Sequence, residues 1–285
     1  SWKNLQYEMA PNPWQTNDDL LGALHDSEKL YDQFIGQLAE SLNAIHKVNF
    51  SQRYWKIVVG AWLSGFIHVV IDRYQTIKAV VEHYPNLTGM FLHEESFIVP
   101  RDTFDYYTLR KGDFYNLQTY TKILKFFGKT FKRASLNCTE ANSGRIIVNG
   151  LKKNKKLAVL KEDVFVWLQK LVYGEPKMVM CGAYFSKKTW PKFILKSKGK
   201  IQRLPVYDSN IAEKSVDFSL RKKLLDNLQS NNDFEKLLIE LISTEIPLCY
   251  IESFVEYRAL SLKKMKIFPQ VIFSTNAWWF NEVFK

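Results

Sequence analysis

The segment of residues 51–77, SQRYWKIVVGAWLSGFIHVVIDRYQTI, constrains the fold more than any other part of the chain. Its central fifteen residues, 57–71, contain no Asp, Glu, Lys or Arg. A helix needs roughly 20 apolar residues to cross a bilayer. This run is shorter and includes two glycines and a histidine. We therefore expect a long buried helix of a globular domain over residues 54–84, ending before Pro85.

A narrow polar stripe runs along this predicted helix. Ser64, His68 and Asp72 recur at a spacing of four, which places them on one face. Such a stripe is either satisfied by neighbouring backbone groups or faces a cleft, and we expect a cleft. The three residue types are those of a nucleophile triad, but one helix face does not usually present them in that geometry. A hydrogen-bonded core histidine is the alternative interpretation of His68.

The composition excludes several classes of protein. Three cysteines lie far apart with no CxxC pair, and the five histidines are scattered. This pattern argues against a disulfide framework and a structural zinc site, and it fits a reducing compartment. No metal is predicted, no signal peptide is recognisable at the start of the sequence, and the common nucleotide, hydrolase and zincin motifs are absent. We expect a cytoplasmic location.

Positive charge is concentrated in residues 129–203, which hold 18 Lys and Arg against 4 Asp and Glu. The whole chain carries a formal net charge of +11. Such a region attracts an anionic membrane surface, a nucleotide or a nucleic acid, and a solvated lysine-rich face is the alternative. Aromatic residues are hardly interleaved with the lysines, so nucleic acid is the less favoured partner. The candidate anionic-surface residues are Lys187, Lys188, Lys192, Lys196, Lys198 and Lys200.

Helical periods alternate with short apolar strands, which favours an α/β layer structure. Strands are predicted at residues 178–181 and 271–274. We expect a helix-rich region over 1–128 and an α/β region with a basic surface over 129–285. The two regions are expected to form one compact domain.

Further candidate residues have charged groups beside apolar stretches. Arg53 and Arg73 each adjoin a tyrosine, and an arginine in such a place needs a carboxylate or phosphate partner. A surface ion pair, such as Arg73 with Asp72, is the alternative. Glu252 and Glu256 lie four residues apart in a predicted helix over 248–264. A carboxylate pair on one helix face suits acid/base chemistry, although a solvated face gives the same pattern.

Several segments together resemble a known family. The segment SLNAIHKVNFSQRYWKIVVGAWLSGFIHVVIDRYQTI resembles a pattern "LN…H…S-x-RYW…G-x-WL…R…I" of transferases from bacterial O-antigen and other surface-polysaccharide clusters. Looser matches are GDFYNLQTYTKIL, YFSK at 184–187, "IP…Y-x-E" at 246–252, and "P-x-[VI]-I-x-[ST]-x-N" followed by a terminal FK. The chain departs from the pattern at Ala61, where proline is common. The resemblance covers nearly the whole chain but only the amino-terminal half of the family.

The resemblance implies a helix-rich, Rossmann-like α/β domain, the acceptor-side half of a two-domain GT-B-type glycosyltransferase. The donor would be a nucleotide-activated sugar, the acceptor a surface carbohydrate, and the location the inner face of the cytoplasmic membrane. A carboxyl-terminal donor-binding domain would be missing from this chain, which alone would be inactive, and no covalently bound cofactor is expected. The candidate catalytic residues are His68, Asp72 and Glu252, and the candidate substrate-binding residues are Arg53, Tyr54, Trp55, Trp62, Arg73 and Tyr257.

Two other classes of function stay open. One is a non-catalytic module that binds a polyanion or nucleic acid through the basic region 129–203. The other is a structural or assembly subunit without chemistry. Salt-steep binding would distinguish the first of these from a transferase.

Overall fold

The computed structural model describes residues 7–134, 164, 167–183, 185–186, 189–204, 211–212, 214–265 and 269–285. The chain divides into two compact units that interleave along the sequence. Unit 1 comprises residues 1–100, 106–144 and 217–246, and unit 2 comprises 101–105, 145–216 and 247–285. Residues 217–246 belong to the same unit as the amino-terminal helices.

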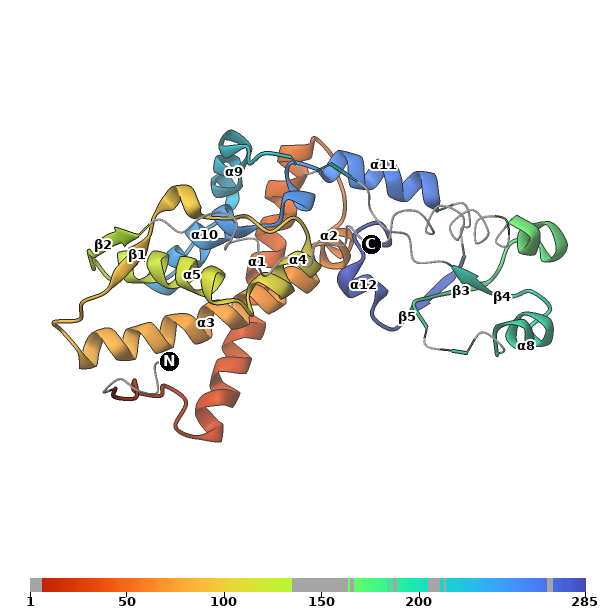
Figure 1. Cartoon of the computed structure of the whole chain (residues 1–285). Coiled ribbons are helices and arrows are strands. Elements are labelled where there is room, and N and C mark those ends of the chain that lie inside the picture. Colours follow the sequence, from red (N-terminus) through yellow and green to blue (C-terminus); the bar gives the residue numbers. More distant parts are fainter. Residues whose placement is uncertain are drawn as a thin grey trace. The chain divides into compact units, whose positions relative to one another are not determined.

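Unit 1 is built on three helices, α1 (Asn17–His46), α2 (Gln52–Val58) and α3 (Gly60–His83), with α1 packed on α3 (Figure 1). Thr16 begins α1 with a capping box, in which its hydroxyl accepts from the Asp19 amide and the Asp19 carboxylate accepts from the Thr16 amide. Ser51 caps α2 by accepting from the amide of Tyr54.

The single helix predicted over residues 54–84 is wrong, because α2 and α3 are separate helices bent by 68° at Val59. Gly60, the first residue of α3, lies against Tyr31 of α1. A Cβ at Gly60 would stand 2.5 Å from the Tyr31 hydroxyl oxygen, so only glycine fits this approach without a shift. The predicted burial is confirmed, since Trp62 and Leu63 of α3 are fully buried.

The other elements of unit 1 pack on α1, on α3 and on one another. Its strands β1 (Met90–Leu92) and β2 (Lys132–Ala134) pair in parallel, and η2 (Glu94–Ser96) follows β1. The helices are α5 (Asp113–Phe126), α9 (Phe218–Lys223), η5 (Leu224–Asn227) and α10 (Asp233–Glu245). Helix α4 (Thr103–Leu109) begins in unit 2 and belongs to unit 1 from Tyr106 onward.

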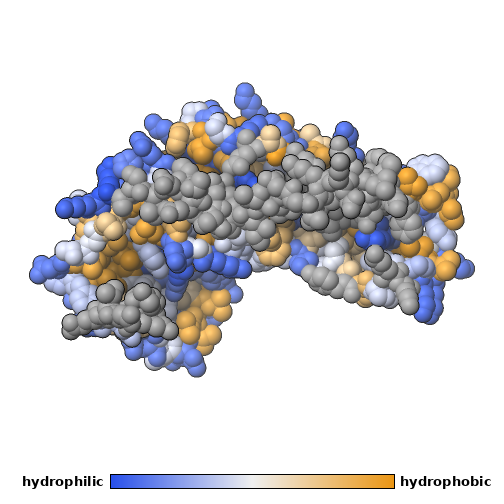
Figure 2. Space-filling model, in the orientation of Figure 1, coloured by the Kyte–Doolittle hydropathy of each residue, from blue (hydrophilic) through white to orange (hydrophobic). Residues whose placement is uncertain are grey.

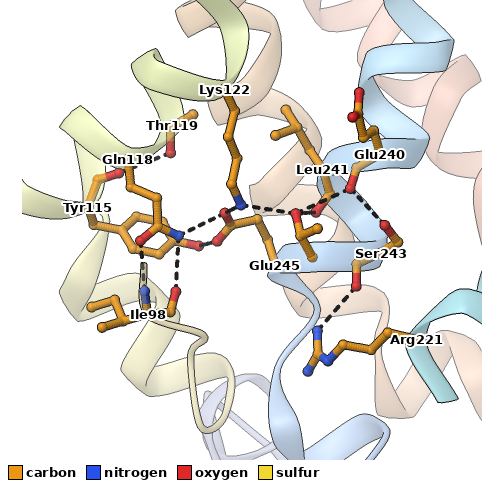
Figure 3. Close-up of polar contacts among 11 residues, drawn as sticks. Ile98, Tyr115, Gln118, Thr119, Lys122, Arg221, Glu240, Leu241, Ser243 and Glu245 are labelled. Carbon is orange, nitrogen blue, oxygen red and sulfur yellow. Dashed lines mark hydrogen bonds and ion pairs between the residues drawn. The ribbon is translucent and has the colours of Figure 1, made fainter. Parts of the chain in front are cut away.

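A buried carboxylate joins α5 to α10. Glu245 accepts hydrogen bonds from the Tyr115 hydroxyl, from Gln118 Nε2 at 2.9 Å and from Lys122 Nζ (Figure 3). Arg221 donates to the main-chain oxygens of Ser243 and Ile246 at the end of the same helix. A buried charge is tolerated only when it is paired and hydrogen-bonded, and Glu245 meets both conditions.

Unit 2 contains a three-stranded parallel sheet in the order β4-β3-β5, with β3 (Met178–Cys181) between β4 (Ile201–Leu204) and β5 (Val271–Ser274) (Figure 1). The predicted strands at 178–181 and 271–274 are confirmed. The helices are α8 (Thr189–Lys196), η6 (Leu248–Tyr250), α11 (Phe254–Lys264) and α12 (Ala277–Phe280). The small core consists of Val179, Cys181, Leu204 and Ala277. The architecture is helix-rich with small parallel sheets, in agreement with the predicted α/β class.

Candidate functional site

The polar stripe of α3 lies outside the dry core of unit 1. His68 is exposed, and Ser64 and Asp72 are half-buried, whereas Leu63, Ile67 and Val70 on the other side of the helix are buried. The polar side and the buried side of this helix, which the sequence predicted, are therefore both present. That the stripe faces a cleft stays a prediction.

Both ring nitrogens of His68 are held. Nδ1 lies 2.8 Å from the main-chain oxygen of Ser64, and because a carbonyl can only accept, Nδ1 carries a proton. Nε2 lies 2.8 Å from Oγ of Ser27, a buried serine of α1. In the neutral ring Nε2 is then the unprotonated nitrogen, and it accepts from the Ser27 hydroxyl. The Ser64 carbonyl thus fixes the neutral tautomer of this exposed histidine, and Ser27 lies beside the other ring nitrogen.

Ser27 has a second acceptor within reach. Its Oγ lies 2.7 Å from the main-chain oxygen of Leu24, one turn earlier in α1. The hydroxyl hydrogen can therefore point to Leu24 or to Nε2, while Oγ stays beside Nε2 in either case. When His68 is charged, Nε2–H can donate to the same Oγ. The contact between Ser27 Oγ and His68 Nε2 can therefore form with the neutral and with the charged imidazole.

Asp72 does not complete a triad with His68. Its Oδ1 accepts from Trp14 Nε1 at 2.9 Å, and its Oδ2 is paired with Arg73. Arg73 also donates from Nε and Nη2 to Asn116 Oδ1 at 3.3 and 3.2 Å, and its guanidinium carbon lies 5.7 Å from the ring centroid of Tyr120. The Arg73–Asp72 ion pair weighed as an alternative is present. It fixes the guanidinium plane of Arg73 on the side of α5.

Two predicted substrate-binding tryptophans lie in the core. Trp55 and Trp62 are fully buried. Trp55 Nε1 donates to Asn43 Oδ1 at 2.9 Å, and the ring of Trp62 stacks on Phe66 with centroids 5.0 Å apart. These contacts favour a packing role.

The other two predicted residues of this group lie on α2. Arg53 is exposed, and Tyr54 is half-buried against Phe50. Both side chains are therefore better placed for a ligand than the two tryptophans.

Glu252 and Tyr257 belong to unit 2. The helix predicted over residues 248–264 is wrong, because η6 and α11 are separate elements and Glu252 lies in the turn between them. Glu252 and Glu256 therefore do not share a helix face. Instead both are linked to Lys214, whose Nζ donates to the main-chain oxygen of Glu252 at 2.8 Å and to the carboxylate of Glu256. The side chain of Glu252 is buried, and that of Tyr257 is half-buried.

Only part of the predicted lysine cluster lies within the residues that the structure describes. Lys187 and Lys188 lie outside the described residues. Lys192, Lys196, Lys198 and Lys200 are all exposed, and none forms an ion pair with another described residue.

A second buried polar cluster lies in unit 2. Lys285 Nζ donates to the oxygens of Tyr250 at 2.8 Å, Thr103 at 3.0 Å and Glu282 at 3.0 Å. Asp102 lies at the start of α4 and accepts from the Asp105 amide at 2.8 Å. Burial, followed by the nearby charge of Glu282, raises the pKa of Asp102 to about 6. Within the described parts of both units, no group of three metal-ligating side chains comes together.

Sequence reasoning missed Ser27, Trp14 and Asn116. Each comes from a segment distant in sequence from the α3 residue that it contacts. Only Ser27 leaves a signal in the sequence, since it lies seven residues before Phe34 on the inward stripe of α1, which is apolar apart from Ser27 and Ser41. A polar residue on such a stripe indicates a buried hydrogen bond.

The fold and a match to a protein family together define a helix-rich α/β transferase. Over residues 1–285 the chain matches the model of the LIC12162 family transferase, and it belongs to this family. The transferase class expected from the resemblance is thereby confirmed. No curated protein and no solved structure matches the chain. No single described helix has the length and hydropathy to cross a membrane, and α2 with α3 meets that test only as a bent pair.

Proposed function

We propose that this transferase acts in glycosyl transfer, and that this chain supplies the acceptor side of the reaction. The donor is a nucleotide-activated sugar and the acceptor is a hydroxyl of a surface carbohydrate such as an O-antigen chain. The resemblance to surface-polysaccharide transferases supports the substrate class. In this proposal the donor is bound by a further GT-B-type domain, so the chain alone does not turn over.

The observation that carries the proposal is the fixed tautomer of the exposed His68. A general base needs an unprotonated nitrogen directed at the proton it removes. Nε2 is that nitrogen, because Nδ1–H is held on the Ser64 carbonyl. The acceptor hydroxyl takes the place of Ser27 as donor to Nε2 once the Ser27 side chain has rotated away, because Ser27 Oγ lies 2.8 Å from Nε2.

The chemical step is a displacement at the anomeric carbon. The acceptor oxygen forms the new bond to this carbon while its proton passes to His68 Nε2. The bond from the anomeric carbon to the phosphate oxygen breaks, and the nucleotide leaves with the electron pair. Positive groups near that oxygen stabilise the developing charge.

Arg73 is the candidate for this electrostatic role. Three of its N–H groups donate to Asp72 and Asn116, and the remaining two of its five have no acceptor among the described residues. A guanidinium held in one plane by three contacts is prepared to receive phosphate oxygens. The charge of Asp72 reduces this effect, so Arg73 would orient the phosphate more than it would attract it.

Binding of the acceptor by this chain can be tested without measuring enzymatic turnover. The isolated 285-residue chain is placed on an array of bacterial surface oligosaccharides, and nucleotide sugars are titrated in parallel by calorimetry. We expect binding to oligosaccharides and none to nucleotide sugars. Binding of a nucleotide sugar, or robust transfer by this chain alone, would place the donor site within the sequence and reject the proposal.

The base is tested in the intact protein as encoded by its own gene. His68→Asn should lower kcat of transfer by roughly 100-fold or more, since general base catalysis contributes about that factor. His25→Asn is the matched control, because His25 is an exposed histidine of α1. Equal activity of the two variants would remove His68 from the mechanism.

A further inference from the structure

The solvent face of α8 combines lysines with an exposed leucine. Lys192, Leu195 and Lys196 lie three and four residues apart and therefore share one face of the helix. All three are exposed, Leu195 by 65%. The opposite face is buried through Trp190 and Ile194. A leucine between two lysines on a solvent face is not explained by the packing of unit 2.

A second apolar stripe lies on the helical residues 167–173. Trp167, Leu168, Leu171 and Val172 follow the spacing of one helix face and are 59%, 44%, 67% and 67% exposed. Gln169, between them in sequence, is buried. Four large apolar side chains on one exposed face mark an interaction site rather than scattered surface residues.

The two helical segments meet at their carboxyl-terminal ends. A Cβ on Gly199, just after α8, would meet Tyr173 Cβ at 2.1 Å, so the turn after α8 lies directly on the end of the second stripe. Gln202 Nε2 donates to the main-chain oxygens of Gly174 and Gly199, both at 3.2 Å, and joins the same two segments. Figure 2 shows hydrophobic side chains beside hydrophilic ones at this end of unit 2.

Exposed lysines lie on α8 and on the segments that join it and residues 167–173 to the sheet. Five exposed lysines of unit 2 belong to α8, the turn after it and the start of β3: Lys177, Lys192, Lys196, Lys198 and Lys200. None of them forms an ion pair with a described residue, and the acidic side chain of Glu175 is already paired with Lys170. Lysines act as point charges rather than bidentate clamps, which suits a diffuse anionic surface better than one fixed phosphate.

We infer that these five lysines together with Trp167, Leu168, Leu171, Val172 and Leu195 form a docking surface for an anionic lipid bilayer. The apolar side chains enter the boundary between headgroups and acyl chains, and the lysines contact the lipid phosphates. The inference is independent of the proposed glycosyl transfer. It extends the predicted lysine cluster by an apolar component that sequence analysis did not identify.

The test uses vesicles of phosphatidylcholine alone and of phosphatidylcholine mixed with phosphatidylserine, with binding measured by co-sedimentation at low and high salt. We expect the chain to bind the mixed vesicles and to be only partly released by salt. Lys192→Gln with Lys196→Gln should weaken partitioning roughly 25-fold, since each lysine contributes about fivefold. The matched control is Lys222→Gln with Lys223→Gln, which neutralises two exposed lysines of α9.

The apolar component is tested separately. Leu171→Ser with Leu195→Ser should weaken partitioning by about tenfold without altering the salt dependence. Leu20→Ser with Leu21→Ser, two exposed leucines of α1, is the control, and circular dichroism confirms folding of each variant. Equal binding to both vesicle types overturns the inference. So does a leucine variant that binds the vesicles like the parent, which would indicate that the lysines alone hold the anionic surface.

Discussion

Ser27 Oγ on α1 lies 2.8 Å from His68 Nε2 on α3, although the residues are 41 positions apart in sequence. With the Ser64 carbonyl on Nδ1, this contact makes Nδ1–H the favoured neutral tautomer. The imidazole is thereby oriented before any substrate binds, as the proposed role of His68 as general base requires.

The tautomer gives a direct prediction. In ¹⁵N-labelled chain at alkaline pH, the side-chain ¹⁵N shifts of His68 should show Nδ1 protonated and Nε2 unprotonated. Ser27→Ala removes the donor to Nε2 and should shift the ratio toward Nε2–H. In the intact protein the same variant should lower kcat roughly tenfold at unchanged KM, a smaller loss than removal of the base. A His68 that is mainly Nε2–H in the parent chain would contradict the assigned hydrogen bonds.

Lys122→Met tests the buried carboxylate between α5 and α10. The substitution leaves the Glu245 charge buried without its cation, so the free energy of unfolding should fall by about 3 kcal/mol. Urea denaturation measures the change. Lys236→Met, which breaks the exposed pair with Asp233, should change little. The double variant Lys122→Met, Glu245→Leu should recover most of the loss, and a loss as large as in the single variant would argue that the buried charge is not the cause.

Asp102→Asn tests the raised pKa in unit 2. Between pH about 4 and about 6 the folded protein binds more protons at Asp102 than the unfolded chain does, so the free energy of unfolding falls as pH rises through this window. Asn retains the acceptor for the Asp105 amide and never ionises. The variant should therefore be more stable than the parent above pH about 6, by at most about 3 kcal/mol, and nearly equal near pH 4.

Asp217→Asn is the control for Asp102→Asn, and its effect on the free energy of unfolding should have the opposite sign. The Ser219 hydroxyl, followed by the Leu220 amide, lowers the pKa of Asp217 at the start of α9. Asp217→Asn should therefore lose stability at neutral pH and match the parent only in strong acid. Thermal melting across pH compares the variants, and parallel profiles for the two would contradict the assignment.

Gly60→Ala tests the close approach at the bend between α2 and α3. A methyl group would stand 2.5 Å from the Tyr31 hydroxyl oxygen, and the next nearest ring atom is 3.6 Å away. We expect a loss of about 1–3 kcal/mol in the free energy of unfolding, as for other overpacked sites. In a Tyr31→Phe background the methyl group fits, and the same substitution should be neutral or stabilising. Equal losses in both backgrounds would show that the backbone at the bend, not Tyr31, requires glycine.

The sequence alone determined the local features of this protein. The apolar run 57–71 predicted buried helix, and Trp62 and Leu63 are buried because an uncharged run of that length can only be covered by a core. The strands at 178–181 and 271–274 were predictable from short apolar runs bounded by turn residues. The i, i+4 spacing correctly placed Ser64, His68 and Asp72 on one side of α3, away from its buried residues.

Only the tertiary structure decided which groups these residues meet. Periodicity gives the face of a helix but not the partner of that face. It could not predict that Ser27 rather than Asp72 contacts His68, or that Arg73 lies between Asp72 and Asn116. The bend at Val59 also escaped prediction, because both helices share one apolar run and the sequence does not show that Tyr31 of α1 lies against Gly60 at the break. Contacts between distant segments depend on how whole helices pack, which local sequence patterns do not encode.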